Sequence, residues 1–194
     1  MDNLERTVDH LHRSAEQSNS FARMDTIKYT TAIQALARNN KVHIAHRYLQ
    51  EMASEYKGGS QACKPDVKIF HAVLSAWARY PQAGVATDKA EALIARLWEL
   101  SKKEARLKPT VFAYNCLLIC CKNAKSPRRA HSLLEEMKDF AEANLIDAPT
   151  ATSYSAVLDA WDRSKDPCKA FKIRLLKGEC TDRFGSVPTS STNW

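Results

Sequence analysis

Histidine and cysteine are the residue types in this chain best suited to hold a metal ion or act as a nucleophile. His43 and His46 can share one helix face, but no third ligand stands at metal-binding spacing, so we expect a surface role and no metal. The cysteines form no CxxC pair, and three of them lie in the apolar run 109–121. We therefore expect buried structural thiols in a reducing compartment rather than disulfides or a zinc site. The cysteines are Cys63, Cys116, Cys120, Cys121, Cys168 and Cys180.

Acidic residues and catalytic motifs give no support for an enzyme. The sequence contains no GxSxG, HExxH, GxxxxGK or GxGxxG motif. Glu135 with Glu136 and Asp159 with Asp162 suit exposed helix positions, and no carboxylate cluster for metal-dependent nuclease chemistry is evident. We expect a protein that is not an enzyme and uses no cofactor.

We expect the secondary structure of this chain to be helical, so helices must position any functional site. Only 5 glycines and 7 prolines occur among 194 residues, which disfavours β-sandwiches, barrels and glycine-rich nucleotide folds. The formal net charge is +7, and the whole excess equals the sum of segment 26–66 (6 − 3 = +3) and segment 67–110 (8 − 4 = +4). A basic region of this kind suggests a polyanionic partner.

The first residues show no targeting signal. They include Asp2, Glu5 and Asp9 and lack a basic or hydrophobic run, so neither a secretory signal nor a transit peptide is visible. The longest apolar run, 109–121, is too short to cross a bilayer, and we expect no membrane association. Either the protein stays where it is made, or the chain lacks its true start.

A repeated pattern runs through residues 24–177. Four segments share an aromatic residue at their fourth position and continue into a small, apolar helix. A proline followed by Asp or Thr precedes each of the last three segments, as at many helix starts. We expect the aromatic residues to pack between helices. The segments begin at Thr26, Val67, Val111 and Ala151, and their aromatic residues are Tyr29, Phe70, Tyr114 and Tyr154.

A second apolar helix follows each segment. An alanine opens it 19 residues after the segment start in three cases and 23 residues after it in the second, which predicts a four-residue insertion in the turn 80–84. Each unit is therefore expected to be a pair of antiparallel helices, because neither helix can bury its apolar face alone. The opening alanines are Ala45, Ala90, Ala130 and Ala170.

The predicted domain organisation follows from these spacings. The four units are 26–66, 67–110, 111–150 and 151–177. In the fourth unit Ala170, Phe171 and Ile173 are expected to pack inward. A partial repeat, the second helix of a truncated hairpin, precedes the units over 1–23, and a loose tail follows over 178–194.

The combined pattern closely resembles the pentatricopeptide repeat (PPR) family. Its best copy joins Val-Phe-Ala-Tyr-Asn-Cys-Leu-Leu-Ile (111–119), preceded by Lys-Pro-Thr, to Ala-His-Ser-Leu-Leu-Glu-Glu-Met (130–137). Successive units start 41, 44 and 40 residues apart, which is longer than is usual in the family and identifies a long-repeat variant. The resemblance implies an all-α, right-handed solenoid of antiparallel helix hairpins.

The resemblance further implies sequence-selective binding of single-stranded RNA, one base per repeat. In the family, the residue after the aromatic and the last residue of the same repeat read the base edge. Carried onto this chain, the base-reading pairs are Thr30 with Asp66, His71 with Thr110 and Asn115 with Thr150, and Ser155 begins an unfinished pair. By the family's habits, Thr30 with Asp66 reads guanine and Asn115 with Thr150 tilts toward a pyrimidine.

Two further sets of RNA-contacting residues follow from the same resemblance. The second residue of a segment clamps the base plane with an apolar side chain, which Ile27 and Phe112 can do. A cation near the end of each first helix contacts phosphate, and cations of this kind make binding salt-dependent. The candidates are Arg38, Arg79, Lys122 and Arg163.

The function implied is that of a non-catalytic adaptor in organellar RNA processing, stability or translation. Family members act mostly in mitochondria or plastids, whereas a cytoplasmic location is expected if the chain is complete. Further candidate partners are other RNA-processing proteins or missing repeats of a longer parent chain. The alternative is a protein-binding, tetratricopeptide-like scaffold with no RNA ligand, although Trp77 and Trp161 lack the Leu-Gly that follows tryptophan in that family.

Overall fold

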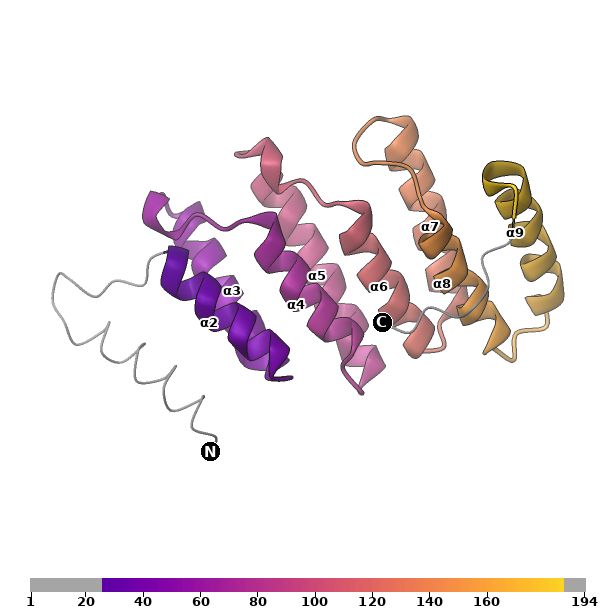
Figure 1. The fold of residues 1–194 in the computed structure, drawn as a ribbon, viewed down its shortest axis with the longest axis horizontal. Coiled ribbons are helices and arrows are strands. Elements are labelled where there is room, and N and C mark those ends of the chain that lie inside the picture. The colour runs from indigo at the N-terminus through magenta and orange to yellow at the C-terminus, as the bar shows by residue number, and fades with distance from the viewer. Residues whose placement is uncertain (1–25, 187–194) are drawn as a thin grey trace, which may run out of the picture. The chain divides into compact units, whose positions relative to one another are not determined.

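The computed structural model describes residues 26–186, and these residues form eight α-helices and two short 3₁₀ helices. The helices follow one another as sequential hairpins, which confirms the all-α prediction (Figure 1). The predicted partial repeat over 1–23 lies outside the described residues. The helices are α2 (Thr26–Arg38), α3 (Val42–Lys57), α4 (Val67–Ala78), α5 (Ala83–Ser101), α6 (Val111–Asn123), α7 (Pro127–Glu142), α8 (Ala151–Asp162) and α9 (Lys169–Phe184).

The chain divides into two units, Met1–Ala76 and Trp77–Trp194. In the first unit α2 packs against α3, where the rings of Tyr29 and Tyr48 meet edge to face with centroids 6.4 Å apart. The Tyr29 hydroxyl donates to Glu55 Oε1 at 3.1 Å, and the Cys63 thiol donates to Glu55 Oε2 at 2.8 Å. Cys63 belongs to the 3₁₀ helix η1 (Gln61–Cys63), so these bonds fasten η1 to the hairpin.

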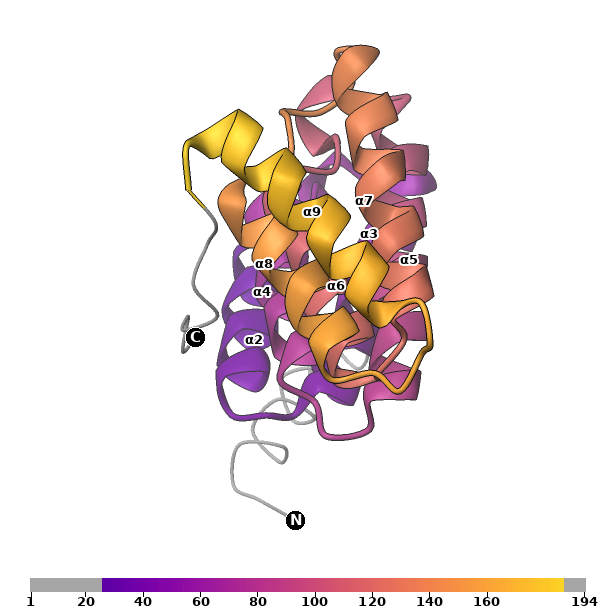
Figure 2. The same cartoon turned by 90° about the vertical axis from the view of Figure 1, so that its right-hand side faces the viewer.

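In the second unit α6 lies at the centre of the packing. It contacts α5, α7 and α8, and α8 in turn contacts α7 and α9. Figure 2 shows α9 in front of α8, with which it packs. None of the helices in the described part of the chain is long and apolar enough to cross a membrane.

Three first helices begin at the predicted residues, Val67, Val111 and Ala151, and α2 is described from its predicted start, Thr26. For α6 and α8 the reason is local N-cap chemistry. Thr110 Oγ1 accepts from the Ala113 N–H at 3.4 Å, and Thr150 forms a capping box with Ser153.

The predicted aromatic packing and apolar ladders are confirmed. The four aromatic side chains are 0–2% exposed, and the ladder residues of the first three second helices are at most 5% exposed. Stacking of these apolar faces forms the core. The ladder residues are Ala45, Tyr48, Leu49, Met52, Ala90, Leu93, Ile94, Leu97, Ala130, Leu133, Leu134 and Met137.

The four extra residues of the second repeat lie in a helix, so their predicted place in the turn is wrong. The turn before α5 spans 79–82, only one residue more than the turns 39–41 and 124–126. Ala90 is the eighth residue of α5, whereas Ala45 and Ala130 are each the fourth residue of their helices. Four residues are close to one helical turn, so α5 reaches 19 residues with its ladder in register.

Residues after the second helices form buried anchors in two of the repeats. The 3₁₀ helices η1 and η2 (Ala105–Leu107) bury Cys63 and Leu107, which are 0% and 2% exposed. Each anchor stands two residues before a buried proline, Pro65 or Pro109. These connecting segments therefore contribute to the core.

The predicted loose tail is wrong for residues 178–184, because α9 continues to Phe184 and ends at Gly185 in the left-handed conformation, with φ 72°. The predicted packing of the fourth unit also needs correction. Phe171 is 66% exposed and Ala170 is exposed, whereas Leu176 and Cys180 are fully buried. The cause is the six-residue connection 163–168, which makes Ala170 the second residue of α9 instead of the fourth and so shifts its buried face.

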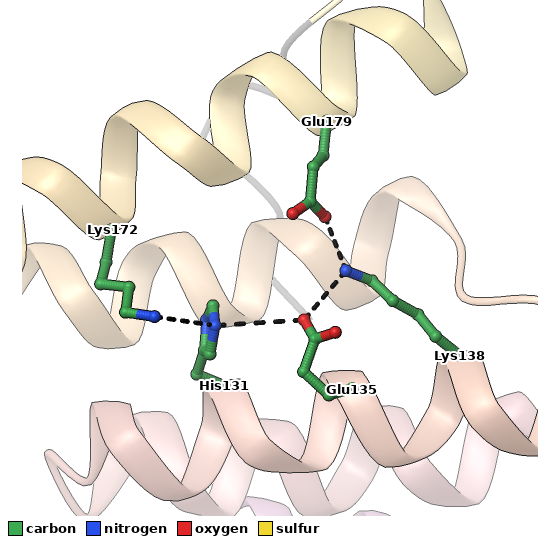
Figure 3. A network of polar contacts seen from close by, with 5 residues as sticks. All are labelled: His131, Glu135, Lys138, Lys172 and Glu179. Atoms are coloured by element: carbon green, nitrogen blue, oxygen red, sulfur yellow. Dashed lines mark hydrogen bonds and ion pairs between the residues drawn. The ribbon is translucent and has the colours of Figure 1, made fainter.

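Polar side chains complete the attachment of α9 to α7 (Figure 3). Lys138 Nζ of α7 donates to Glu179 Oε2 of α9 at 2.6 Å and to Glu135 Oε1 at 2.9 Å. Lys172 Nζ lies 3.4 Å from His131 Nε2. Burial, and then the charge of Lys172, lower the pKa of His131, so this histidine is the neutral partner in the network.

Candidate nucleic-acid interface

One predicted base-reading pair, Asn115 and Thr150, is brought together by the packing of α6 on α8. Ser153, on the first turn of α8, donates its hydroxyl to Asn115 Oδ1 at 2.7 Å. The same Ser153 Oγ accepts the backbone N–H of Thr150 at 3.1 Å and lies 3.4 Å from Thr150 Oγ1. The two predicted residues therefore share one buried hydroxyl, although 35 positions separate them in the chain.

This arrangement fixes which polar atoms are left for a ligand. Ser153 is fully buried, whereas Asn115 is half-buried and Thr150 is exposed. Because Asn115 accepts through Oδ1, its Nδ2 keeps both N–H donors, and the Thr150 hydroxyl can donate or accept. The pair can thus offer donors to the acceptor atoms on a base edge.

Ser153 itself was missed by the sequence analysis. Its signal is present, since Thr150 and Ser153 have the N-cap and N3 spacing of a capping box. The contact with Asn115 crosses between helices, so the sequence alone could not have assigned it.

Ser155 does not belong to an exposed surface. It is only 7% exposed, so the expectation that its side chain meets a base is wrong. The reason is the packing of α8, which buries every residue from Ser153 to Leu158 against its neighbours.

In the first unit, Thr30 and Asp66 lie on separate elements with different partners. The Thr30 hydroxyl donates to the Thr26 carbonyl one turn earlier, at 2.6 Å, so its oxygen remains an acceptor. Asp66 is exposed at the start of α4 and accepts the Lys68 N–H at 3.4 Å. No hydrogen bond joins Thr30 to Asp66 within the described residues.

His71 and Thr110 belong to different units, and each is placed by its own helix. His71 is half-buried on α4, and burial lowers its pKa while the charge of Asp66 acts in the opposite direction. Thr110 Oγ1 caps α6. Burial therefore favours the neutral imidazole of His71.

Both predicted base clamps are large apolar side chains at the surface. Ile27 is 75% exposed on α2, and Phe112 is 44% exposed on α6. They occupy the second position of their helices. Such side chains can cover the face of a base.

The predicted phosphate contacts divide into two groups. Arg38, Arg79 and Arg163 are exposed at or just after the ends of α2, α4 and α8. Lys122 instead lies 3.8 Å from Asp159 Oδ2, and both side chains are less than a fifth exposed. Asp159 thus compensates the charge of Lys122, which makes it the weakest phosphate candidate of the four.

The cysteines and histidines form no metal site in the part of the chain that the structure describes. Five cysteines are buried and only Cys168 is exposed, as expected for structural thiols with that one exception. Burial raises the pKa of Cys116 and of Cys120 to about 12 and that of Cys121 to about 11. The predicted surface role of the histidine pair holds for His43 alone, since His46 is only 5% exposed.

Comparison with known proteins supports the repeat interpretation. The model of the PPR repeat family matches residues 28–55 and 112–140. These segments correspond to the hairpins α2–α3 and α6–α7. No curated protein matches the chain in sequence. The two matched segments, and the helix hairpins that they form, are therefore similar to PPR repeats.

Proposed function

We propose that this protein binds single-stranded RNA with base selectivity and acts, without catalysis, as an adaptor in organellar RNA processing, stability or translation. Two PPR repeats support RNA as the ligand, since proteins of this repeat class read one base per repeat. The proposed base-reading residues are Thr30, Asp66, His71, Thr110, Asn115 and Thr150, with Ile27 and Phe112 as clamps and Arg38, Arg79 and Arg163 as phosphate contacts.

The observation that carries this proposal is the shared hydroxyl of Ser153. It ties Asn115 of α6 to Thr150 at the start of α8, and these are the two positions that the repeat resemblance pairs on one base. A purely structural role needs only the capping bond to Thr150. The additional bond orients the Asn115 amide, and an oriented amide can discriminate between bases.

Fluorescence anisotropy with labelled RNA tests the proposal. The full chain is titrated with short single strands of each homopolymer and with an RNA duplex, at about 50 mM and 200 mM salt. We expect single strands to bind better than the duplex, one pyrimidine strand to be preferred by the Asn115 position, and affinity to fall at the higher salt. Equal binding of all strands and the duplex would refute base selectivity.

A pair of variants assigns that selectivity to the interface. Asn115→Ala removes the oriented amide, and we expect preference among strands that differ at one base to fall severalfold, since a good base contact contributes about 1–3 kcal/mol. Gln50→Ala is the matched control, because it deletes an exposed amide on the second helix α3. Equal loss of selectivity in both variants would contradict the assignment.

A protein-binding scaffold is the second candidate function. The observation that favours it is the apolar outer face of α9, where Phe171 and Leu175 lie one turn apart and are 66% and 43% exposed. Exposed apolar side chains of this kind suit a protein contact. Absence of RNA binding at low salt would favour this function.

A further inference from the structure

The two turns that follow the first helices of the second unit enclose an open basic pocket. One wall is the turn between α6 and α7 with the start of α7, and the other is the connection between α8 and α9. The pocket volume is about 600 Å³, which is room for more than one phosphoryl group. Its lining residues are Lys125, Ser126, Pro127, Arg128, Arg129, Arg163, Ser164, Lys165 and Asp166.

The charge of this lining is strongly positive. Five cations face one acid, which gives 5 − 1 = +4. Arg129 is compensated, since its Nε and Nη1 each lie 2.8 Å from the carboxylates of Glu91 and Glu136. No acidic partner within the described residues compensates Lys125, Arg163 or Lys165, so three cations remain for a ligand.

Asp166 holds a fourth cation in place. Its Oδ2 accepts from Arg128 Nε at 2.7 Å, and its Oδ1 accepts the Cys168 N–H at 2.9 Å. Asp166 is only 12% exposed, and the hydrogen bond from Arg128 holds its pKa below the usual value. Arg128 therefore keeps its Nη donors for a ligand while its orientation is fixed.

Lys125 occupies a backbone conformation that suits lysine poorly. Its φ is 53°, in the left-handed region. The equivalent turn between α2 and α3 has Asn40 there, with φ 59°, and asparagine tolerates this region better than most residues. A strained residue that delivers an uncompensated charge to a pocket indicates a binding role.

The start of α7 adds backbone donors. Its N-cap residue Ser126 makes no side-chain capping bond, and Pro127 occupies the first turn. The amides of the first turn and the helix dipole therefore favour an anion at this end. This contribution reinforces the four side-chain cations that define the pocket.

We propose that this pocket is a phosphate-binding site that takes two or more linked phosphoryl groups, held by Lys125, Arg128, Arg163 and Lys165. These groups can be successive phosphodiesters of a bound RNA strand, each with one negative charge, or the phosphates of a free polyphosphate. The site goes beyond the proposed base reading, because only Arg163 belongs to both.

Sodium tripolyphosphate is the probe for this site. We expect its titration into the full chain to shift the backbone amide resonances of Arg128, Arg129 and Ser164, and to give saturable binding by calorimetry. Lys165→Gln should weaken that binding about fivefold or more, as expected for loss of a direct cation contact. Lys177→Gln, which removes an exposed cation farther along α9, should leave it unchanged.

The variant Lys125→Gly distinguishes an effect on tripolyphosphate binding from an effect on fold stability. Glycine relieves the left-handed strain, so Tm should rise while tripolyphosphate affinity falls about fivefold or more. Asn40→Gly is the control, because it changes the equivalent turn without removing a cation. If tripolyphosphate shifts no pocket amide, or binds both lysine variants as tightly as the unaltered chain, the proposal is wrong.

The same variants identify the source of the phosphoryl group. Competition of tripolyphosphate with RNA, together with weaker RNA binding by Lys165→Gln, supports the RNA backbone. Unchanged RNA binding with lost tripolyphosphate binding supports a free polyphosphate. Base-selective RNA binding without any pocket shift overturns only this inference, whereas a filled pocket without base selectivity overturns only the proposed function.

Discussion

The hydroxyl of Ser153 takes part in two structures at once. It completes the capping box of α8 and orients the Asn115 amide of α6. Ser153→Ala should therefore destabilise the fold by about 1 kcal/mol through the lost cap and should also reduce discrimination between bases. Urea unfolding measures the first effect, and anisotropy with strands that differ at one base measures the second.

Ser155→Ala is the matched control for this prediction. It deletes a buried hydroxyl from the same helix, two residues farther on. Base discrimination should stay unchanged, because Ser155 does not reach the surface. If both variants change selectivity to the same extent, the effect comes from general destabilisation of α8. The role assigned to Ser153 would then be wrong.

Thiol reactivity gives a second prediction at the residue scale. Burial raises the pKa of Cys116, Cys120 and Cys121 to about 12, 12 and 11, so these thiols stay protonated and shielded at pH 8. Alkylation of the folded chain should label Cys168 first, and the buried cysteines only after unfolding. Mass spectrometry of timed samples measures this order, and early labelling of Cys120 would contradict the buried packing of α6.

At the scale of the element, the sequence predicts helix starts far better than helix contacts. The starts at Val111 and Ala151 depend on a proline and a cap within three residues, which are local features. The buried face of α9 depends on the length of the connection before it. The repeat pattern does not predict that length. This is why Phe171 was expected inside and lies outside.

Helix α9 contains one glycine and is followed directly by another, and the two have opposite requirements. Gly178 lies within the helix, and a Cβ there would meet nothing within 4 Å. Gly178→Ala should stabilise the fold by about 0.5–1 kcal/mol, because alanine loses less backbone entropy in a helix. Gly185 has φ 72°, so Gly185→Ala should destabilise it.

Denaturant midpoints of these two variants measure the prediction. Far-UV circular dichroism should show a small gain of helix for Gly178→Ala. A loss of stability for Gly178→Ala would mean that residues around 178 are not helical in solution, and the shorter repeat boundary at 177 would then be correct.

At the scale of the whole molecule, the sequence predicted which residues recur but not which of them stay available. Recurrence placed Asn115 and Ser155 in one set of equivalent positions and Lys122 in another. Long-range contacts then gave them different surroundings, since Ser153 orients Asn115, packing buries Ser155 and Asp159 compensates Lys122. Whether a side chain can reach a ligand depends on residues from other repeats. The sequence of one repeat does not contain this information.

The dependence of RNA affinity on salt concentration measures the combined effect of the separate cations. For single strands the slope of log K against log salt is about −0.7 for each phosphate contacted, so contacts from Arg38, Arg79 and Arg163 should give a slope of about −2. Arg163→Gln should reduce the slope by about 0.7, whereas Arg174→Gln should leave it unchanged, although both remove one exposed charge. Anisotropy titrations at four salt concentrations give the slopes. Equal reductions in both variants would mean that RNA responds only to the net charge of +7 and that no defined row of contacts exists.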